Sequence, residues 1–216
     1  AAELNDWFDP SFVEVVDGDA LDLPVPDDSV DLAAQNCLFN IFIEEDLQRA
    51  LSEMKRVLVP HGALSISDPI CENPIPERLQ QDERLRAMCL SGAMPLDEYV
   101  GHMTGVGFGT VEIRGRRPYR VLDARRFGIE EDIMLETVEI TAINDPVPPD
   151  GPCVFTGRMV FYTGDDEYFD DGRGHIATPD VPLAVCDKTA DWFANLERDD
   201  FTITASTYHY IGGRCC

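Results

Sequence analysis

The pattern of hydrophobic and polar positions predicts alternating strands and helices over the first part of the chain. Residues 44–59 form the clearest helix, since apolar side chains recur every three or four residues and Pro60 and Gly62 follow. These apolar residues are Leu47, Ala50, Leu51, Met54, Val57 and Leu58. Short β-type runs lie on either side, at 30–35 and 63–67. A strand, a helix and a strand at this spacing predict a βαβ unit and a mainly parallel sheet.

The rest of the chain is divided by prolines and glycines into shorter elements. Helices are expected at 77–88, 96–103 and 189–196, and strands at 12–16, 111–113, 119–122, 154–163 and 201–204. Residues 130–143 are ambiguous, because their β-branched residues favour a strand and their acidic start favours a helix. Residues 1–8 are expected to end an amphipathic helix. The pattern therefore predicts an α/β sheet followed by mixed α and β segments.

The chain is strongly acidic. Its 216 residues carry a formal net charge of −24, and Lys occurs only at Lys55 and Lys188. This balance is typical of halophilic proteins, in whose salty cytoplasm ions screen the self-repulsion. No nucleic-acid partner is expected, because phosphate binding needs a basic surface. Without an apolar run of roughly 20 residues or a visible secretory leader, we expect a cytoplasmic protein with no membrane partner.

Seven cysteines are spread irregularly along the chain. Their odd number and the lack of a secretory signal argue against a disulfide framework. No Cys-x-x-Cys or His-x3-His pair is present, so no metal site is expected. Cys71, Cys153 and Cys186 are best explained as small buried side chains.

A possible nucleotide-binding loop follows the run 12–16. It reads Asp17-Gly18-Asp19-Ala20. In an open parallel sheet, ligands bind beyond the carboxyl ends of the strands. Asp19 could accept a hydrogen bond from an exocyclic amine there, and the small Ala20 would let an aromatic base lie flat. The alternative is a plain turn in which Gly18 supplies backbone freedom.

Two further motifs carry cysteines to the same edge of the predicted sheet. Asn36-Cys37 ends the strand 30–35, and Cys89-Leu90-Ser91-Gly92-Ala93 lies in the segment after the strand 63–67. Each cysteine alone is best explained as a buried apolar residue. Two thiols that converge on one pocket would instead suit a soft metal or metalloid.

In combination, these motifs resemble the arsenite methyltransferases, which use S-adenosylmethionine as methyl donor. The later segments are similar to a subgroup of that family associated with arsenosugar genes. Those segments are 155–157, 169–172, 185–189 and 206–210 with the final cysteine pair. The resemblance runs from Val13 to the end of the chain.

The resemblance implies an incomplete class I methyltransferase, a Rossmann-like α/β sheet with a helical substrate insertion and an α+β C-terminal extension. The partial methyltransferase domain would cover 1–123, with the insertion at about 70–105. The extension would cover 124–216, with a strand at about 154–163 and a Cys-Cys tail.

The resemblance also implies roles for particular residues. Arsenic would be bound by Cys37, Cys89, Cys215 and Cys216. The cofactor S-adenosylmethionine would be contacted by Asp19, Ala20 and Asn36. No catalytic acid or base is assigned, because the thiolates position arsenic for methyl transfer. Since thiols bind as thiolates, arsenite binding is expected to weaken at low pH.

One departure limits the resemblance. The family begins with a strand, a Gly-rich loop and an acidic residue for the ribose, and no such loop follows a strand at the start of this sequence. The chain is therefore expected to be an N-terminally truncated fragment that binds the donor weakly, and whether it is active alone stays open. Its substrate would be arsenite or a glutathione-type thiol adduct, for detoxification or an arsenosugar route. A methyltransferase for another small molecule and a metalloid-binding fragment without catalysis remain alternatives, and the oligomeric state stays open.

Overall fold

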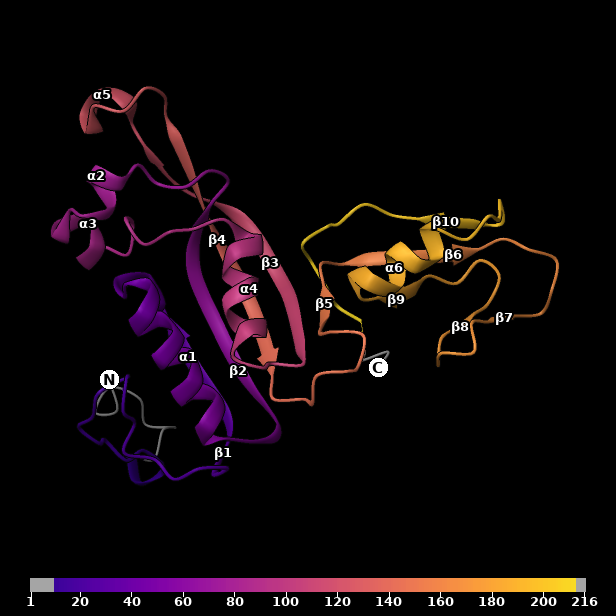
Figure 1. The fold of residues 1–216 in the computed structure, drawn as a ribbon, viewed down its shortest axis with the longest axis horizontal. Helices are drawn as coiled ribbons and strands as arrows, with labels where there is room; N and C mark the ends of the chain where they lie inside the picture. The colour runs from indigo at the N-terminus through magenta and orange to yellow at the C-terminus, as the bar shows by residue number, and fades with distance from the viewer. Residues whose placement is uncertain (1–9, 213–216) are drawn as a thin grey trace.

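A computed structural model describes residues 10–212 and shows two units (Figure 1). The large unit, residues 10–155, is built on a five-stranded sheet. The small unit, residues 158–204, contains a three-stranded sheet and one helix. The strands of the larger sheet are β1 (Val30–Asn36), β2 (Leu58–Cys71), β3 (Thr110–Leu122), β4 (Ile133–Ile143) and β5 (Cys153–Phe155).

The order of strands in the larger sheet is β1-β2-β4-β3-β5. β1 and β2 are parallel, and α1 (Glu44–Val57) connects them, which confirms the predicted βαβ unit. β4 pairs antiparallel with both β2 and β3, and β5 runs parallel to β3. The sheet thus combines a parallel edge with an antiparallel centre, and it continues past residue 124, where the extension was expected to begin. The ambiguous residues 130–143 supply one of its central strands.

Helices α1 and α4 (Leu96–Gly105) lie over one face of this sheet (Figure 1). The main apolar cluster fills the space between them and includes Leu51, Leu64, Ile66 and Met103. Alternate residues of β2, such as Ser65, point to the other face, which is polar. The alternation explains why β2 reads in sequence as a half-buried strand.

The predicted helix 77–88 is two short helices, α2 (Glu77–Gln80) and α3 (Glu83–Ala87). The break has a local cause: Asp82 caps α3, its Oδ1 accepting hydrogen bonds from the backbone N–H groups of Arg84 at 2.9 Å and Leu85 at 3.2 Å. These helices pack with α5 (Ala124–Phe127) around a second apolar cluster that includes Leu85 and Leu90.

The small unit follows a sharp change of direction at Gly157. The predicted strand 154–163 is wrong as one element, because β5 belongs to the large sheet and β6 (Arg158–Tyr162) to the small one. Gly157 between them has φ +83°, a conformation that glycine adopts readily. In the small sheet β6 lies between β9 (Leu183–Val185) and β10 (Phe201–Ile203), and α6 (Asp187–Ala194) packs against it. A hairpin of β7 (Phe169–Asp170) and β8 (Ile176–Ala177) completes the unit.

The last described residues return to the large unit. The backbone N–H of Tyr208 donates to Thr156 O at 2.7 Å, and that of Tyr210 donates to Ile113 O at 2.8 Å. Tyr210 then packs with Phe155, Cys153 and Cys186 in a cluster that joins the two units.

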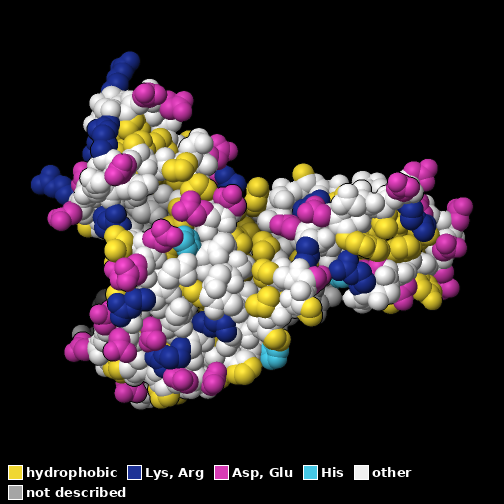
Figure 2. Space-filling view, in the orientation of Figure 1, with side chains coloured by type: hydrophobic (Ala, Val, Ile, Leu, Met, Phe, Trp, Pro, Cys, Tyr) yellow, Lys and Arg dark blue, Asp and Glu magenta, His cyan; other side chains and the backbone are white. Residues whose placement is uncertain are grey.

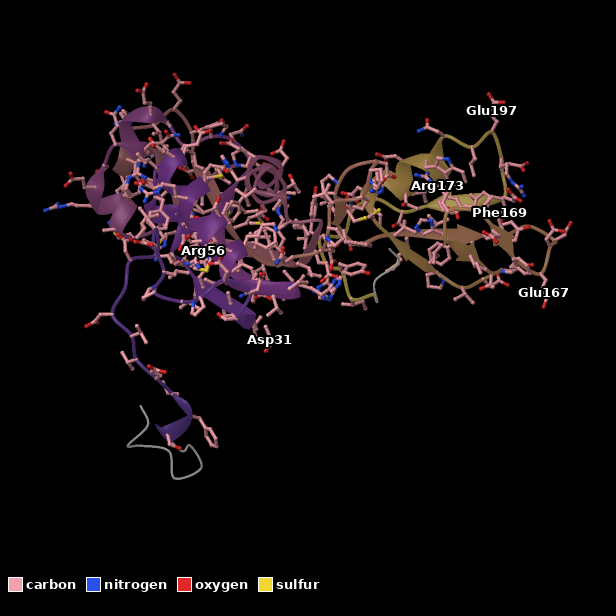
Figure 3. The ribbon with its side chains drawn as sticks, turned by 60° about the horizontal axis from the view of Figure 1, so that its bottom comes forward. Asp31, Arg56, Glu167, Phe169, Arg173 and Glu197 are labelled. Carbon is pink, nitrogen blue, oxygen red and sulfur yellow. The ribbon has the colours of Figure 1, made fainter. Side chains whose placement is uncertain are left out.

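The predicted strand 12–16 is wrong. Residues 13–18 have no regular structure, and Val15 is 89% exposed. Figure 3 shows this part of the chain extending away from the body of the protein. A β-type run forms a strand only where another strand offers it hydrogen bonds, and residues 10–212 provide no such partner here. The short helix η2 (Pro10–Phe12) precedes this region, and the short helix η3 (Phe39–Ile41) follows β1. The expected helix end at 1–8 lies outside the described residues.

Candidate arsenic-binding and donor site

Cys37 lies just beyond the carboxyl end of β1. Its backbone N–H donates to Ser67 O on β2 at 3.0 Å, so the ladder continues one residue past the strand. The chain then turns, and Cys37 has φ 56°, in the left-handed region. The position agrees with the expectation that ligands bind beyond the ends of parallel strands.

Cys89 reaches the same place from the insertion. It lies in the turn after α3 and also has a left-handed backbone, with φ 58°. Its Sγ donates a hydrogen bond to Cys37 O at 2.6 Å across 52 residues of sequence. Both thiols are free and half-buried. The structure therefore brings together the two cysteines that the sequence predicted to converge.

Gly92 makes this convergence possible. A Cβ at this position would lie 1.9 Å from Asn40 O, well inside contact distance. The loop of Cys89 therefore packs directly on the backbone that follows Cys37. Asn40 anchors the loop after Cys37, because its Nδ2 donates to Pro69 O on β2 at 2.7 Å and, more weakly, to Cys89 O at 3.5 Å.

A buried carboxyl, Asp68, lies beside the two thiols. The β1–β2 register pairs Asn36 with Ser67, so Cys37 and Asp68 are the next neighbours. Asp68 has no exposed surface, and its Oδ2 accepts hydrogen bonds from Gln35 Nε2 and from the Tyr99 hydroxyl. Its Oδ1 is buried without a hydrogen-bond partner.

Burial and charge shape the chemistry of this cluster. Burial raises the pKa of Asp68 to about 6, opposed by the hydrogen bonds from Tyr99 and Gln35 and by the nearby backbone N–H of Cys37. Burial, and then the charge of Asp68, raises the pKa of Cys37. Burial, and then the charges of Cys37 and Asp68, raises the pKa of Cys89 to about 11. Both thiols are thus protonated at neutral pH, and a carboxylate lies close to them.

The predicted donor loop lies along α1. Arg56, labelled in Figure 3, donates to Val25 O at 2.9 Å and to Leu23 O at 3.0 Å. Glu53 accepts from the backbone N–H of Leu23 at 2.8 Å. Gly18 lets the loop close, because a Cβ there would lie 2.5 Å from Pro24 Cδ. α1 therefore fixes the loop that carries Asp19.

The residues assigned to the donor are open to solvent or partly so. Asp19 is exposed, and its Oδ1 accepts from the backbone N–H of Leu21 at 2.9 Å. Ala20 is half-buried, and Asn36 is exposed at the end of β1. An exposed carboxylate beside a small residue suits the adenine amine and ring of S-adenosylmethionine. These residues fit one side of the donor, although their role stays a prediction.

The other cysteines fall into two groups. Cys71, Cys153 and Cys186 are buried, and burial raises the pKa of Cys71 to about 12. Cys215 and Cys216 lie outside the described residues. Among residues 10–212, no group of three or more His, Cys, Asp or Glu side chains could hold a metal ion.

The sequence prediction did not include Asp68, Tyr99 or Gln35 in the site. Asp68 directly follows the predicted strand 63–67, so the rule that drew attention to Asp19 could have found it. Tyr99 had no such signal, because its contact depends on where α4 packs.

A separate cavity of about 710 Å³ lies between the two units. Its walls include Arg116, Asp187 and Tyr208, but none of the residues predicted for the site. Figure 2 shows hydrophobic side chains where the units meet, with acidic side chains spread around them. No helix in residues 10–212 is long and apolar enough to cross a membrane.

Comparison with known proteins agrees with this architecture. Residues 1–66 match a family described as "Methyltransferase domain". The matches to solved structures include an arsenic(III) S-adenosylmethionine methyltransferase from Chlamydomonas reinhardtii, at 25% identity and a TM-score of 0.49, over 87% of this chain and 64% of that one. The family match supports the predicted class I methyltransferase fold, and S-adenosylmethionine is the methyl donor of this class.

Curated relatives are more specific. An arsenite methyltransferase of Halobacterium salinarum is 35% identical over 105 residues, which are 49% of this chain and 26% of the relative. An arsenite methyltransferase of Aquipseudomonas alcaligenes is 29% identical over 106 residues, 49% of this chain and 30% of the relative. The chain spans less than a third of the length of either. The predicted resemblance to the arsenite methyltransferase family is confirmed.

Proposed function

We propose that this chain forms the acceptor side of an arsenite methyltransferase, in which Cys37 and Cys89 hold trivalent arsenic. The contact between the two thiol-bearing loops carries this proposal. The residues are half-buried and free, and Cys89 Sγ lies 2.6 Å from Cys37 O. Two soft sulfur ligands at the mouth of a ligand-binding sheet suit arsenic better than a hard cation.

The residues of the chain would position the reactants. S-adenosylmethionine, when bound, supplies an electrophilic methyl group. Asp19, Ala20 and Asn36 would contact its adenosine part, and the two cysteines would hold arsenic with its lone pair free. Cys215 and Cys216 would capture arsenic or hand it over. The substrate would be arsenite or its thiol adduct, in a cytoplasmic detoxification or arsenosugar route.

The raised thiol pKa values refine the expected effect of pH. Arsenous acid carries hydroxyl groups, and each thiol that binds arsenic can release its proton to a departing hydroxyl as water. Binding then releases no net proton, so low pH should slow the reaction more than it weakens the complex.

Protection from alkylation tests the arsenic site. Arsenite should protect Cys37 and Cys89 in the 216-residue chain from iodoacetamide, and the rate of protection should fall near pH 5. Cys37→Ser and Cys89→Ser should abolish the protection of the remaining thiol, whereas Cys71→Ser should leave it intact. Full protection in either site variant would contradict the proposal.

Calorimetry with S-adenosylmethionine distinguishes the alternatives. Weak donor binding together with arsenite binding supports a methyltransferase acceptor half. Arsenite binding without donor binding favours a metalloid-binding fragment. Donor binding without arsenite binding favours a methyltransferase for another small molecule.

A further inference from the structure

Asp68 is a buried carboxyl that the proposed function has not yet used. It lies on β2 directly after Ser67, where the pairing with β1 ends and Cys37 follows Asn36. The described residues contain three buried side-chain polar atoms without a hydrogen-bond partner, and two of them, Asp68 Oδ1 and Ser91 Oγ, belong to the segments around the thiols. A buried carboxylate oxygen without a hydrogen-bond partner lowers the stability of the fold, so its presence here needs an explanation.

The two oxygens of Asp68 have different surroundings. Oδ2 accepts hydrogen bonds from Gln35 and Tyr99, which fix the orientation of the carboxyl group. Oδ1 accepts none. The group is near enough to Cys37 and Cys89 for its charge to affect both thiols. One oxygen is thus held, while the other keeps its lone pairs in a cluster whose two thiols feel the charge of the carboxylate. In the structure the Cys89 S–H donates to Cys37 O, so it must turn from that oxygen before it can transfer its proton.

We propose that Asp68 is the proton acceptor for Cys37 and Cys89 when arsenous acid binds, with Tyr99 and Gln35 as positioning residues. This inference rests on the proposed function. The sulfur of each cysteine forms a bond to arsenic as its S–H proton moves to Asp68 Oδ1. The arsenic–oxygen bond breaks, and the departing hydroxyl takes that proton and leaves as water. Asp68 returns to the carboxylate, and nothing is oxidised or reduced.

The protonation states of the cluster suit this role. Asp68, with a pKa of about 6, is ionised at neutral pH while both thiols keep their protons. The titratable groups that face Asp68 are these thiols and Tyr99, whose own pKa is raised by burial and by Asp68. Tyr99 therefore stays protonated and keeps donating to Oδ2.

The first test is Asp68→Asn in the full chain with sodium arsenite as the probe. The measured quantities are the rate at which arsenite protects Cys37 and Cys89, read by an alkylation quench and mass spectrometry, and the alkylation rate without arsenite. General base catalysis is worth roughly 100-fold or more, so protection should slow by about that factor. Alkylation without arsenite should be equal or faster, because removing a negative charge favours the thiolate.

Asp187→Asn is the matched control. Asp187 is another carboxyl whose pKa burial raises, but it lies on α6 of the small unit, where its Oδ1 accepts a hydrogen bond from Thr156 Oγ1 at 2.6 Å. In this variant, arsenite should protect Cys37 and Cys89 from alkylation at the wild-type rate. Equal rates in Asp68→Asn and wild type, or a loss of protection matched by a loss of alkylation, would overturn the proposal. If arsenite did not protect Cys37 and Cys89 in the wild type, the proposed function itself would be contradicted.

Tyr99→Phe tests the positioning role. It removes one hydrogen bond to Oδ2 and leaves the ring in place, so ionised Asp68 becomes less stable and its pKa rises. The midpoint of the pH profile for arsenite protection should move to higher pH. An unmoved midpoint would contradict the role of Tyr99, since a purely structural change alters the rate and not the midpoint.

Discussion

The protein contains two places where cysteines distant in sequence come together, one at the end of β1 in the large unit and one where the two units meet. Cys37 and Cys89 are half-buried beside a carboxyl group at the end of a parallel strand. Cys153 and Cys186 are buried with the rings of Phe155 and Tyr210, whose centroids lie 4.6 Å apart. Proximity of thiols is therefore not enough to define a binding site. Access to solvent and polar neighbours distinguish the pair proposed to bind arsenic from the fully buried pair.

Opening the aromatic cluster is the largest expected perturbation. Phe155→Ala removes a buried ring and should lower the free energy of unfolding by about 3–5 kcal/mol. Cys153 and Cys186 should then be alkylated faster, while arsenite protection of Cys37 and Cys89 persists. Denaturant unfolding and site-resolved alkylation measure both effects. Arsenite protection of Cys153 and Cys186 in this variant would show that access alone distinguishes the pairs.

Separating the loops of Cys37 and Cys89 is the next largest perturbation. In Gly92→Ala the new methyl group meets Asn40 O, so the Cys89 loop must move off the backbone that follows Cys37. We expect a loss of about 2 kcal/mol, typical of overpacking, and loss of arsenite protection. Gly101→Ala is the control, because a Cβ there meets nothing within 4 Å. It should stabilise α4 by roughly 0.5–1 kcal/mol and leave protection unchanged.

Asp68→Asn should have a pH-dependent effect on stability. The pKa of Asp68 in the folded protein is raised from 3.8 to about 6, so its favourable contribution is present below the unfolded value and lost as pH rises through about 6. Above that pH the variant should be more stable by about 1–2 kcal/mol. This gain is smaller than the free energy that corresponds to the full pKa shift, because the new amide N–H groups lack hydrogen-bond partners. The curves should converge below about pH 4. Urea midpoints across pH measure this, and a constant difference would contradict it.

Replacing either lysine should have the smallest effect on stability. Lys55 lies in the large unit and Lys188 in the small unit, so the two variants again compare the two units. Lys188 Nζ donates to Asp150 Oδ1 and to Gly151 O, both at 2.6 Å, and Lys55 Nζ donates to Asn144 Oδ1 at 2.6 Å. Replacing Lys188 by Met should cost less than about 1 kcal/mol, and added salt should reduce the difference. Lys55→Met has no ion pair to screen, so its effect should depend less on salt.

Periodicity predicted the elements whose packing is local. The α1 helix and its flanking strands follow from the spacing of Leu47, Leu51 and Met54, because one face must meet the sheet. The strand predicted at 12–16 is absent, because a strand forms only beside a partner strand and periodicity does not reveal that partner. The strand 154–163 was wrong for a different reason: Gly157 redirects the chain between two sheets.

The site was predicted in part for similar reasons. Cys37 follows from a motif at a strand end and Cys89 from a motif in the insertion, and the structure brings the two loops together as predicted. The orientation of the Asp68 carboxyl depends on hydrogen bonds to its Oδ2 from Tyr99 on α4 and Gln35 on β1. Such a contact joins three distant segments, so no local pattern carries it.

The left-handed backbones of Cys37 and Cys89, with φ of 56° and 58°, bear on why these residues are cysteines. For a residue with a side chain this conformation costs about 1–2 kcal/mol, whereas glycine adopts it freely. Selection for stability alone would place glycine at both positions. Under the proposed function, this energetic disadvantage is the cost of presenting each sulfur atom to arsenic.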